Sequence, residues 1–151
     1  MASISYAADK LAYLDLSRPF SEYNKTKDYD KVLTDKENVY TTERETKVGE
    51  IKKLQDKLNL LSEKEKESKK GDLETKAKNL QDFDREKQTD LRKEQDDKMK
   101  ELLKDIEKVV KDYAEKEGIT MVFNDRLLVY QTKSMDITDK IIDMLNKSYK
   151  K

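Results

Sequence analysis

The sequence contains no cysteine, no histidine and no tryptophan, and it has only one proline and three glycines. Without cysteine and histidine, the chain lacks the usual zinc ligands, the thiol nucleophile and the most common general base near neutral pH. Gly49, Gly71 and Gly118 are too far apart to form a glycine-rich phosphate loop. We therefore expect a protein that is not an enzyme, with no catalytic residue, no bound metal and no cofactor. The absence of cysteine leaves the redox compartment open.

Apolar residues are also scarce, because they make up 34% of the chain while charged residues make up 44%. A globular domain is about 45 to 50% apolar when glycine is counted. Thirty-three basic and thirty-three acidic residues cancel, so no net charge draws the protein to nucleic acid. Disordered chains share this composition. Helix is favoured, however, because residues 27–116 contain no proline and are rich in leucine, lysine, glutamate and glutamine.

Residues 27–117 are predicted to form a hairpin arm of two long helices. The outgoing run places apolar residues at spacings of three, four and three, on one helical face: Ile51, Leu54, Leu58 and Leu61. Residues 62–72 contain no apolar side chain and include Gly71, so we place the tip of the hairpin there. The return run repeats every eleven residues, about 3.67 per turn, which predicts a nearly straight helix: Leu80, Leu91, Leu102 and Tyr113.

The two ends of the chain, residues 9–26 and 118–151, are predicted to form a small body in an α+β fold. We expect strands at residues 10–16, 119–123 and 127–131, and a final helix that begins near Asp136. Three short strands and one helix bury little surface, so several copies should pool their strands in an oligomer. The residues assigned to this oligomerisation body are Leu11, Tyr13, Leu14, Leu16, Phe20, Met121, Phe123, Leu128, Tyr130, Ile137 and Ile141.

Residues 1–8 form a separate leader with two interpretations. Ser5-Tyr6-Ala7 before Ala8-Asp9-Lys10 has the small-x-small form of a secretory cleavage site, which indicates the remnant of a signal peptide. The alternative is a disordered leader. No apolar run in this segment is long enough to span or insert into a membrane.

Both ends of the chain resemble the Skp/OmpH family of periplasmic chaperones, in the segments ADKLAYLDLSRPF and GITMVFNDRLLVYQTKSMDITDKIIDMLNK. The most specific parts are the strand DKLAYLDL, Phe20 after it, the paired strands MVF and LLVY, and Asp136-Ile137-Thr138. The resemblance implies a homotrimer in which strands of three chains form a small barrel, with three hairpins around a cavity. It further implies an ATP-independent holdase that binds unfolded outer-membrane proteins in the periplasm, and it favours the signal-peptide interpretation.

A chaperone that works without ATP must hold its client through many weak contacts. Sparse apolar side chains on charged arms suit this requirement, and the candidates are Val39, Tyr40, Leu54, Leu58, Leu61, Leu80, Phe83, Leu91 and Met99. The alternative is that these residues pack the two helices of the hairpin together, which we favour for the five leucines. Tyr40, Phe83 and Met99 fit that packing less regularly.

Charge separates this chain from the best-known members of that family, which are strongly basic. The tip lysines alternate with glutamates, a pattern typical of a solvated face. The lipopolysaccharide site of some members is not carried over, because Phe83 and Glu94 fall where cations are needed and only Arg92-Lys93 stays basic. A second class of function is a coiled-coil scaffold that binds one folded partner. The apolar stripe thins between Leu80 and Met99, which favours the holdase.

Overall fold

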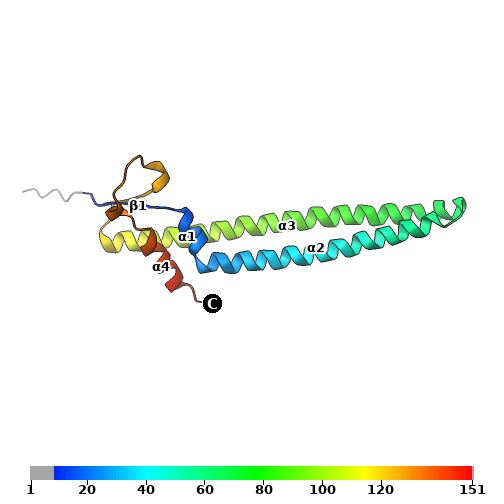
Figure 1. Cartoon of the computed structure of the whole chain (residues 1–151), viewed down its shortest axis with the longest axis horizontal. Helices are drawn as coiled ribbons and strands as arrows, with labels where there is room; N and C mark the ends of the chain where they lie inside the picture. Colours follow the sequence, from blue (N-terminus) through cyan, green and yellow to red (C-terminus); the bar gives the residue numbers. More distant parts are fainter. Residues whose placement is uncertain (1–8, 151) are drawn as a thin grey trace, which may run out of the picture. The chain divides into compact units, whose positions relative to one another are not determined.

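The structure is a computed structural model that describes residues 9–150. The expected leader, residues 1–8, lies outside the described residues. Two units divide the chain: a terminal unit, up to Asp30 and from Lys98 onward, and a hairpin unit of residues 31–97. The elements are β1 (Leu11–Leu14), α1 (Ser17–Glu22), α2 (Asn24–Asn59), α3 (Glu63–Glu117), β2 (Met121–Asn124), the 3-10 turns η1 (Asp125–Leu127) and η2 (Lys133–Met135), and α4 (Thr138–Ser148) (Figure 1).

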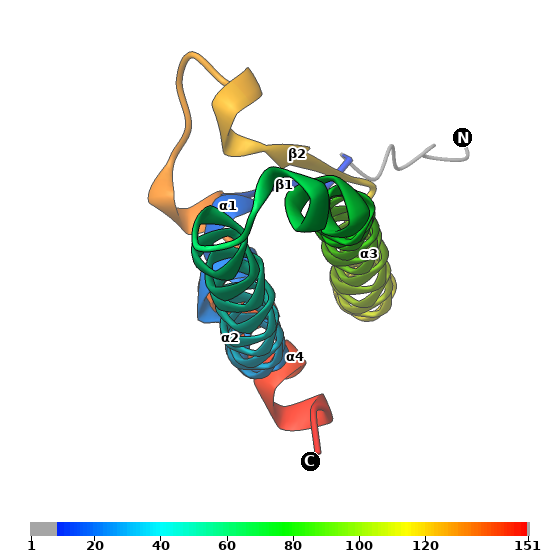
Figure 2. The same ribbon diagram turned by 90° about the vertical axis from the view of Figure 1, so that its right-hand side faces the viewer.

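The only sheet in the described part of the chain pairs β1 with β2 in parallel, with Leu11 opposite Met121 and Leu14 opposite Asn124 (Figure 2). Parallel strands need a long crossover connection, and here α2 and α3 lie between the two strands in sequence. The carbonyl oxygen of Tyr13 also accepts a hydrogen bond of 3.0 Å from the N–H of Ile137. The C-terminal part of the chain is thereby joined to β1 near the N-terminus, as the sequence predicted.

The third strand expected at residues 127–131 is absent from the structure of residues 9–150, so that prediction is wrong for the single chain. The side chain of Asn124 accepts a hydrogen bond from the N–H of Arg126 and starts the turn η1 instead. Leu127, Val129 and Tyr130 are exposed by 76%, 106% and 84%. A strand needs a neighbour for its backbone groups, and no strand within residues 9–150 pairs with this segment.

The core of the terminal unit is formed by side chains of β1, of the C-terminal part of α3 and of α4. Its buried residues are Ala12, Leu14, Tyr23, Leu102, Ile106, Ile137, Ile141 and Leu145. Ile141 and Leu145 are one helical turn apart and fully buried, as the apolar spacing of this segment predicted. Each fully buried aliphatic side chain contributes about 1.5 to 3 kcal/mol relative to exposure, so α4 is held mainly by this face.

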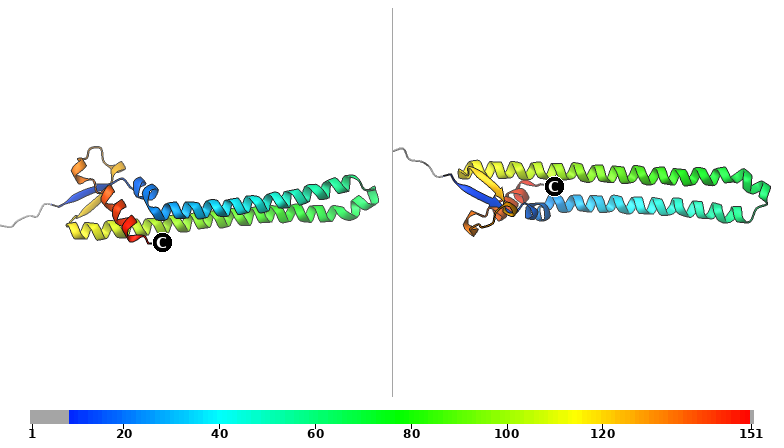
Figure 3. Two further views of the ribbon diagram at one scale, coloured as in Figure 1. Left: turned by 60° about the horizontal axis from the view of Figure 1, so that its bottom comes forward. Right: turned by 90° about the horizontal axis from the view of Figure 1, so that it is seen from above.

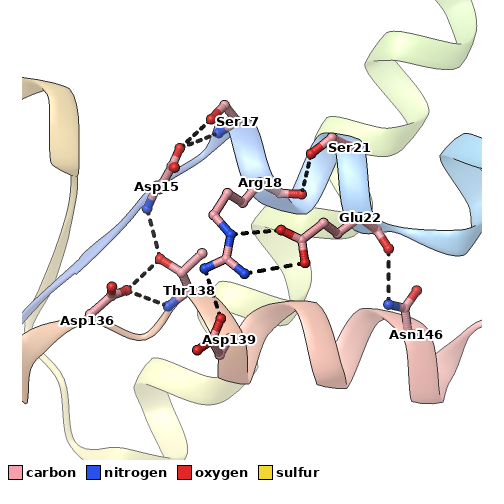
Figure 4. A network of polar contacts seen from close by, with 9 residues as sticks. All are labelled: Asp15, Ser17, Arg18, Ser21, Glu22, Asp136, Thr138, Asp139 and Asn146. Atoms are coloured by element: carbon pink, nitrogen blue, oxygen red, sulfur yellow. Dashed lines mark hydrogen bonds and ion pairs between the residues drawn. The ribbon is translucent and has the colours of Figure 1, made fainter. Parts of the chain in front are cut away.

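A polar network holds the start of α4 against the segment that follows β1 (Figure 4). The buried hydroxyl of Thr138 accepts a 3.0 Å hydrogen bond from the N–H of Asp15. Asp136 accepts hydrogen bonds from the N–H and the hydroxyl of Thr138, at 2.9 and 2.5 Å. The carboxylate of Asp136 therefore holds the first residue of α4, although the N-cap position itself is Ile137, one residue later than Asp136.

The same network includes α1, whose Arg18 binds Glu22 within α1 at 2.7 Å and Asp139 of α4 at 2.9 Å (Figure 4). Asp15 accepts two hydrogen bonds from Ser17, and these bonds hold the pKa of the Asp15 carboxyl below its usual value. Arg18 is therefore held between a carboxylate of α1, Glu22, and a carboxylate of α4, Asp139.

The chain reverses over residues 60–62, between α2 and α3, whereas Gly71 lies inside α3 (Figure 3). The sequence placed the tip near residues 62–72 with Gly71 at the reversal. Ser62 explains the difference, because its N–H and hydroxyl both donate to the Glu65 carboxylate, at 3.1 and 2.5 Å. This capping pattern starts a helix at residue 63. A glycine within a helix costs only about 0.5 to 1 kcal/mol relative to alanine, so α3 continues through it.

Candidate functional site

A groove of about 450 Å³ lies in the hairpin unit, between facing stretches of α2 and α3. Its lining repeats with helical spacing on both helices, with Val32, Asp35, Lys36, Val39 and Tyr40 from α2, and Lys87, Asp90, Leu91 and Glu94 from α3. The volume is within the usual range for binding pockets, about 300 to 1,000 Å³. Helical periodicity therefore places the lining residues of each wall on one face of its own helix.

Aliphatic side chains in this groove stay in contact with solvent. Val32 is 42% exposed and Val39 is 57% exposed, while Leu91 on the opposite wall is half-buried. The free energy is lowered when another apolar group covers an exposed aliphatic side chain. The groove can therefore accept an apolar side chain from another molecule.

An aromatic cluster next to the groove joins the two helices of the hairpin. The rings of Tyr40 and Phe83 are 5.7 Å apart between centroids and tilted by 39°. The ammonium groups of Lys47 and Lys87 lie 4.9 and 5.6 Å from the centroid of the Phe83 ring. Both distances suit cation–π attraction, which is worth about 0.5 to 1 kcal/mol at exposed sites.

Polar contacts set the register of the two helices beside these rings. Asp84 accepts a hydrogen bond from the Tyr40 hydroxyl and another from Arg44, both at 3.1 Å. Lys36 pairs with Glu94 at 2.5 Å. Exposed ion pairs contribute little individually, about 0 to 1 kcal/mol, so their main effect is to determine which residues face each other.

Nearer the turn, Lys76 pairs with Glu50 at 2.9 Å, and the hydrogen bond from Lys76 lowers the pKa of the Glu50 carboxyl. This pair again joins α2 to α3 across the hairpin. Charged side chains therefore connect the helices at several levels where apolar contacts are few.

The structure brings together only part of the set of client-binding candidates. Val39, Tyr40 and Leu91 line the groove, and Phe83 adjoins it. The leucines at 54, 58, 61 and 80 lie in the hairpin unit outside the groove lining, with Leu58 buried and the others half-buried. Met99 belongs to the terminal unit, where it is 51% exposed. Val32 was missed, although its seven-residue spacing from Val39 keeps both valines on one face.

The residues assigned to an oligomerisation body fall into three groups. Tyr13, Leu14, Ile137 and Ile141 are buried. Leu16, Phe20, Phe123 and Leu128 are half-buried. Leu11, Met121 and Tyr130 are exposed, which leaves them available for contact with another molecule.

A charged cluster in the terminal unit was not anticipated from the sequence. Lys25 is only 14% exposed and lies 2.6 Å from both Glu101 and Asp105. Burial alone lowers the pKa of Lys25, but the hydrogen bonds to Asp105 and Glu101 outweigh it and raise the pKa. Burial and the nearby Asp105 raise the pKa of Tyr23 to about 12. No short sequence motif predicts this cluster, because Lys25 and its two acidic partners are about eighty residues apart.

Metal-binding clusters and membrane-spanning helices are both absent from residues 9–150. No three acidic residues there converge into a group that could hold a metal ion. No helix in the same stretch is both long enough and apolar enough to cross a membrane.

Comparison with known proteins identifies the family. The sequence profile of the family described as "Outer membrane protein (OmpH-like)" matches residues 10–145. No curated protein matches the chain. A crystal structure from Caulobacter crescentus CB15, of an OmpH-like protein described as a candidate outer membrane chaperone, has a TM-score of 0.86 at 12% identity and covers 99% of this chain and 90% of that one. This likeness confirms the fold, a helical hairpin with a small strand pair from the two chain ends. Because the family profile covers most of its length, the chain belongs to the OmpH-like family, as the resemblance of its two ends predicted.

Proposed function

We propose that this protein is an ATP-independent holdase chaperone of the periplasm, which binds unfolded outer-membrane proteins and prevents their aggregation. Membership of the OmpH-like family supports a chaperone role. The observation that carries the proposal is the groove itself, where Val32 and Val39 are exposed on the same face of α2, in a hairpin whose surface is rich in charged side chains.

Each apolar contact between a client and the groove contributes little binding free energy. At about 25 cal/mol per Å² of apolar surface, covering one partly exposed valine stabilises a complex by about 1 kcal/mol or less. A client is therefore released readily from one groove and held only when several sites act together. No nucleotide is needed for either step.

Several copies of the hairpin are required for this grip, and we propose a homotrimer whose arms surround the client. Leu127, Val129 and Tyr130 support self-association, because they expose apolar surface directly after β2. The outer edge of β2 is also unpaired within residues 9–150, whereas β1 bridges to Asp136 on its other side, and open sheet edges in proteins are usually covered. Strands from neighbouring copies would cover both features and close a barrel.

The test is suppression of aggregation, without nucleotide, of two or more unrelated outer-membrane proteins diluted from denaturant. The wild-type protein should keep each client soluble. The double variant Val32→Ser/Val39→Ser should need several times more protein for the same effect. Val48→Ser is the matched control, because Val48 is an exposed valine of α2 outside the groove.

Two results would contradict the proposal. No suppression for any client would refute the holdase function, and saturable binding of one folded partner would then favour a scaffold. Equal loss of activity in the groove variant and the Val48 control would remove the groove from the mechanism.

A further inference from the structure

We propose that the groove of the hairpin unit selects client segments in which a lysine or arginine neighbours an apolar side chain. This inference rests on the proposed holdase function and specifies the chemistry of what the groove holds. It comes from the charges that line the groove and from their distribution along the hairpin.

The cations of the groove are already engaged. Lys36 is paired with Glu94 at 2.5 Å. The ammonium group of Lys87 lies over the ring of Phe83, 5.6 Å from its centroid. Neither lysine is therefore free to attract an acidic client segment.

Two acids of the groove are not engaged. Asp35 on α2 and Asp90 on α3 make no ion pair or side-chain hydrogen bond with any residue between 9 and 150. One stands on each wall of the groove, and both are exposed to solvent. A cation that enters between the walls meets a carboxylate from either helix.

The charge of the surrounding surface has the same sign. Residues 31–46 and 79–97, which contain the groove, carry seven basic and eleven acidic side chains. Residues 47–78, the part of the hairpin that contains the turn, carry ten basic and seven acidic side chains. The protein has no net charge overall, but the region around the groove is acidic. This region attracts cations over a distance of about 10 Å at ordinary salt concentrations.

Lysine and arginine also match the apolar part of the groove. Their aliphatic stems pack on apolar surface while the charged group remains in water. A stem that lies along Val32 and Val39 leaves its charge close to the level of Asp35, which lies between the two valines in sequence on the same helical face. An apolar neighbour in the client can then contact Leu91.

The test compares three unstructured peptides that share the same valine, leucine and tyrosine residues. One carries two arginines, one carries two glutamates and one is uncharged. Binding to the full-length protein is measured by fluorescence anisotropy at low and high salt. We expect the arginine peptide to bind several-fold more tightly than the glutamate peptide, with the difference shrinking as salt increases.

The variant Asp35→Asn/Asp90→Asn should abolish this preference, so that the arginine and glutamate peptides bind with equal affinity. Asp56→Asn/Asp72→Asn is the control, because it removes one acid from each helix outside the groove and should keep the preference. Circular dichroism checks that both variants remain helical.

Each alternative outcome is distinct. Equal affinity for the arginine and glutamate peptides, or a preference that survives Asp35→Asn/Asp90→Asn, would overturn the inference. A change in oligomeric state in that variant alone would show that a second copy occupies the groove, which also overturns it. Aggregation suppression by the wild-type protein is measured in parallel, so failure of the holdase function is recognised separately.

Discussion

At the scale of single residues, Thr138 shows how much one hydroxyl organises. It is 1% exposed, accepts the N–H of Asp15 and donates to Asp136. Thr138→Val keeps the volume but leaves the N–H of Asp15 without its partner. We expect this variant to lower the free energy of unfolding by about 1 to 3 kcal/mol, the cost of an unsatisfied buried polar group.

Urea unfolding followed by circular dichroism measures this loss. Thr138→Ser is the matched control, since it retains the hydroxyl and should lose clearly less stability than the valine variant. Equal loss in the two variants would mean that the methyl group, rather than the hydrogen bonds, is what matters at this position.

Three buried or half-buried tyrosines, Tyr13, Tyr23 and Tyr29, predict a loss of stability at alkaline pH. The pKa of Tyr23 is raised to about 12 by burial and by Asp105, and burial also raises the pKa of Tyr13 and Tyr29. A tyrosine whose pKa is higher in the folded state stabilises the fold below its unfolded pKa of about 10. That stabilisation is lost as the pH rises through the folded value.

The urea midpoint should therefore be constant from neutral pH to about pH 10 and fall between about pH 10 and pH 12. Parallel titration of tyrosinate absorbance should place the ionisation of Tyr23 in the same range. Tyr23→Phe should flatten part of the decline, and an identical decline in this variant would assign the effect to other groups.

At the scale of secondary-structure elements, the glycines test where the long helices end. Gly71 lies inside α3, and nothing stands within 4 Å of the place where a Cβ would go. Gly71→Ala should raise the free energy of unfolding by about 0.5 to 1 kcal/mol, because alanine favours helix. A turn at Gly71 would instead make this substitution destabilising.

Gly118 provides the opposite case, since it ends α3 with a φ of +67°. Alanine in this left-handed conformation costs about 1 to 2 kcal/mol. Gly118→Ala should therefore lower the urea midpoint, while Gly71→Ala raises it. Shifts of the same sign in both variants would contradict the helix boundaries described above.

At the scale of the whole molecule, the segment after β2 tests self-association. The triple variant Leu127→Ser/Val129→Ser/Tyr130→Ser removes exposed apolar surface and leaves the core of the terminal unit intact. We expect it to shift the protein from trimer towards monomer in sedimentation equilibrium, with helix content unchanged.

A wild-type protein that sediments as a monomer at all concentrations would contradict the proposed trimer. A triple variant that stays trimeric would place the interface elsewhere, for example on the exposed Leu11 and Met121 of β1 and β2. Loss of helix content in the variant would instead give this segment a role in folding.

The sequence by itself determined the features that depend on neighbours in the chain. The three-to-four-residue spacing of Ile51, Leu54 and Leu58 is a property of one helix, and the apolar face of α4 is equally local. Leu61, predicted on the same helical face, falls in the turn instead, because α2 ends at Asn59. Specific segments at both ends were sufficient to identify the family. The fold class could thus be predicted before any coordinates.

Only the tertiary structure decided which residues face each other across long separations. The position of Phe83 beside Tyr40, the burial of Lys25 between Glu101 and Asp105, and the groove between α2 and α3 all depend on the register of paired elements. Spacing along one helix carries no information on that register. Residues 127–131 had the pattern of a strand but find no partner strand among residues 9–150, and a strand is stabilised by its neighbour rather than by its own sequence.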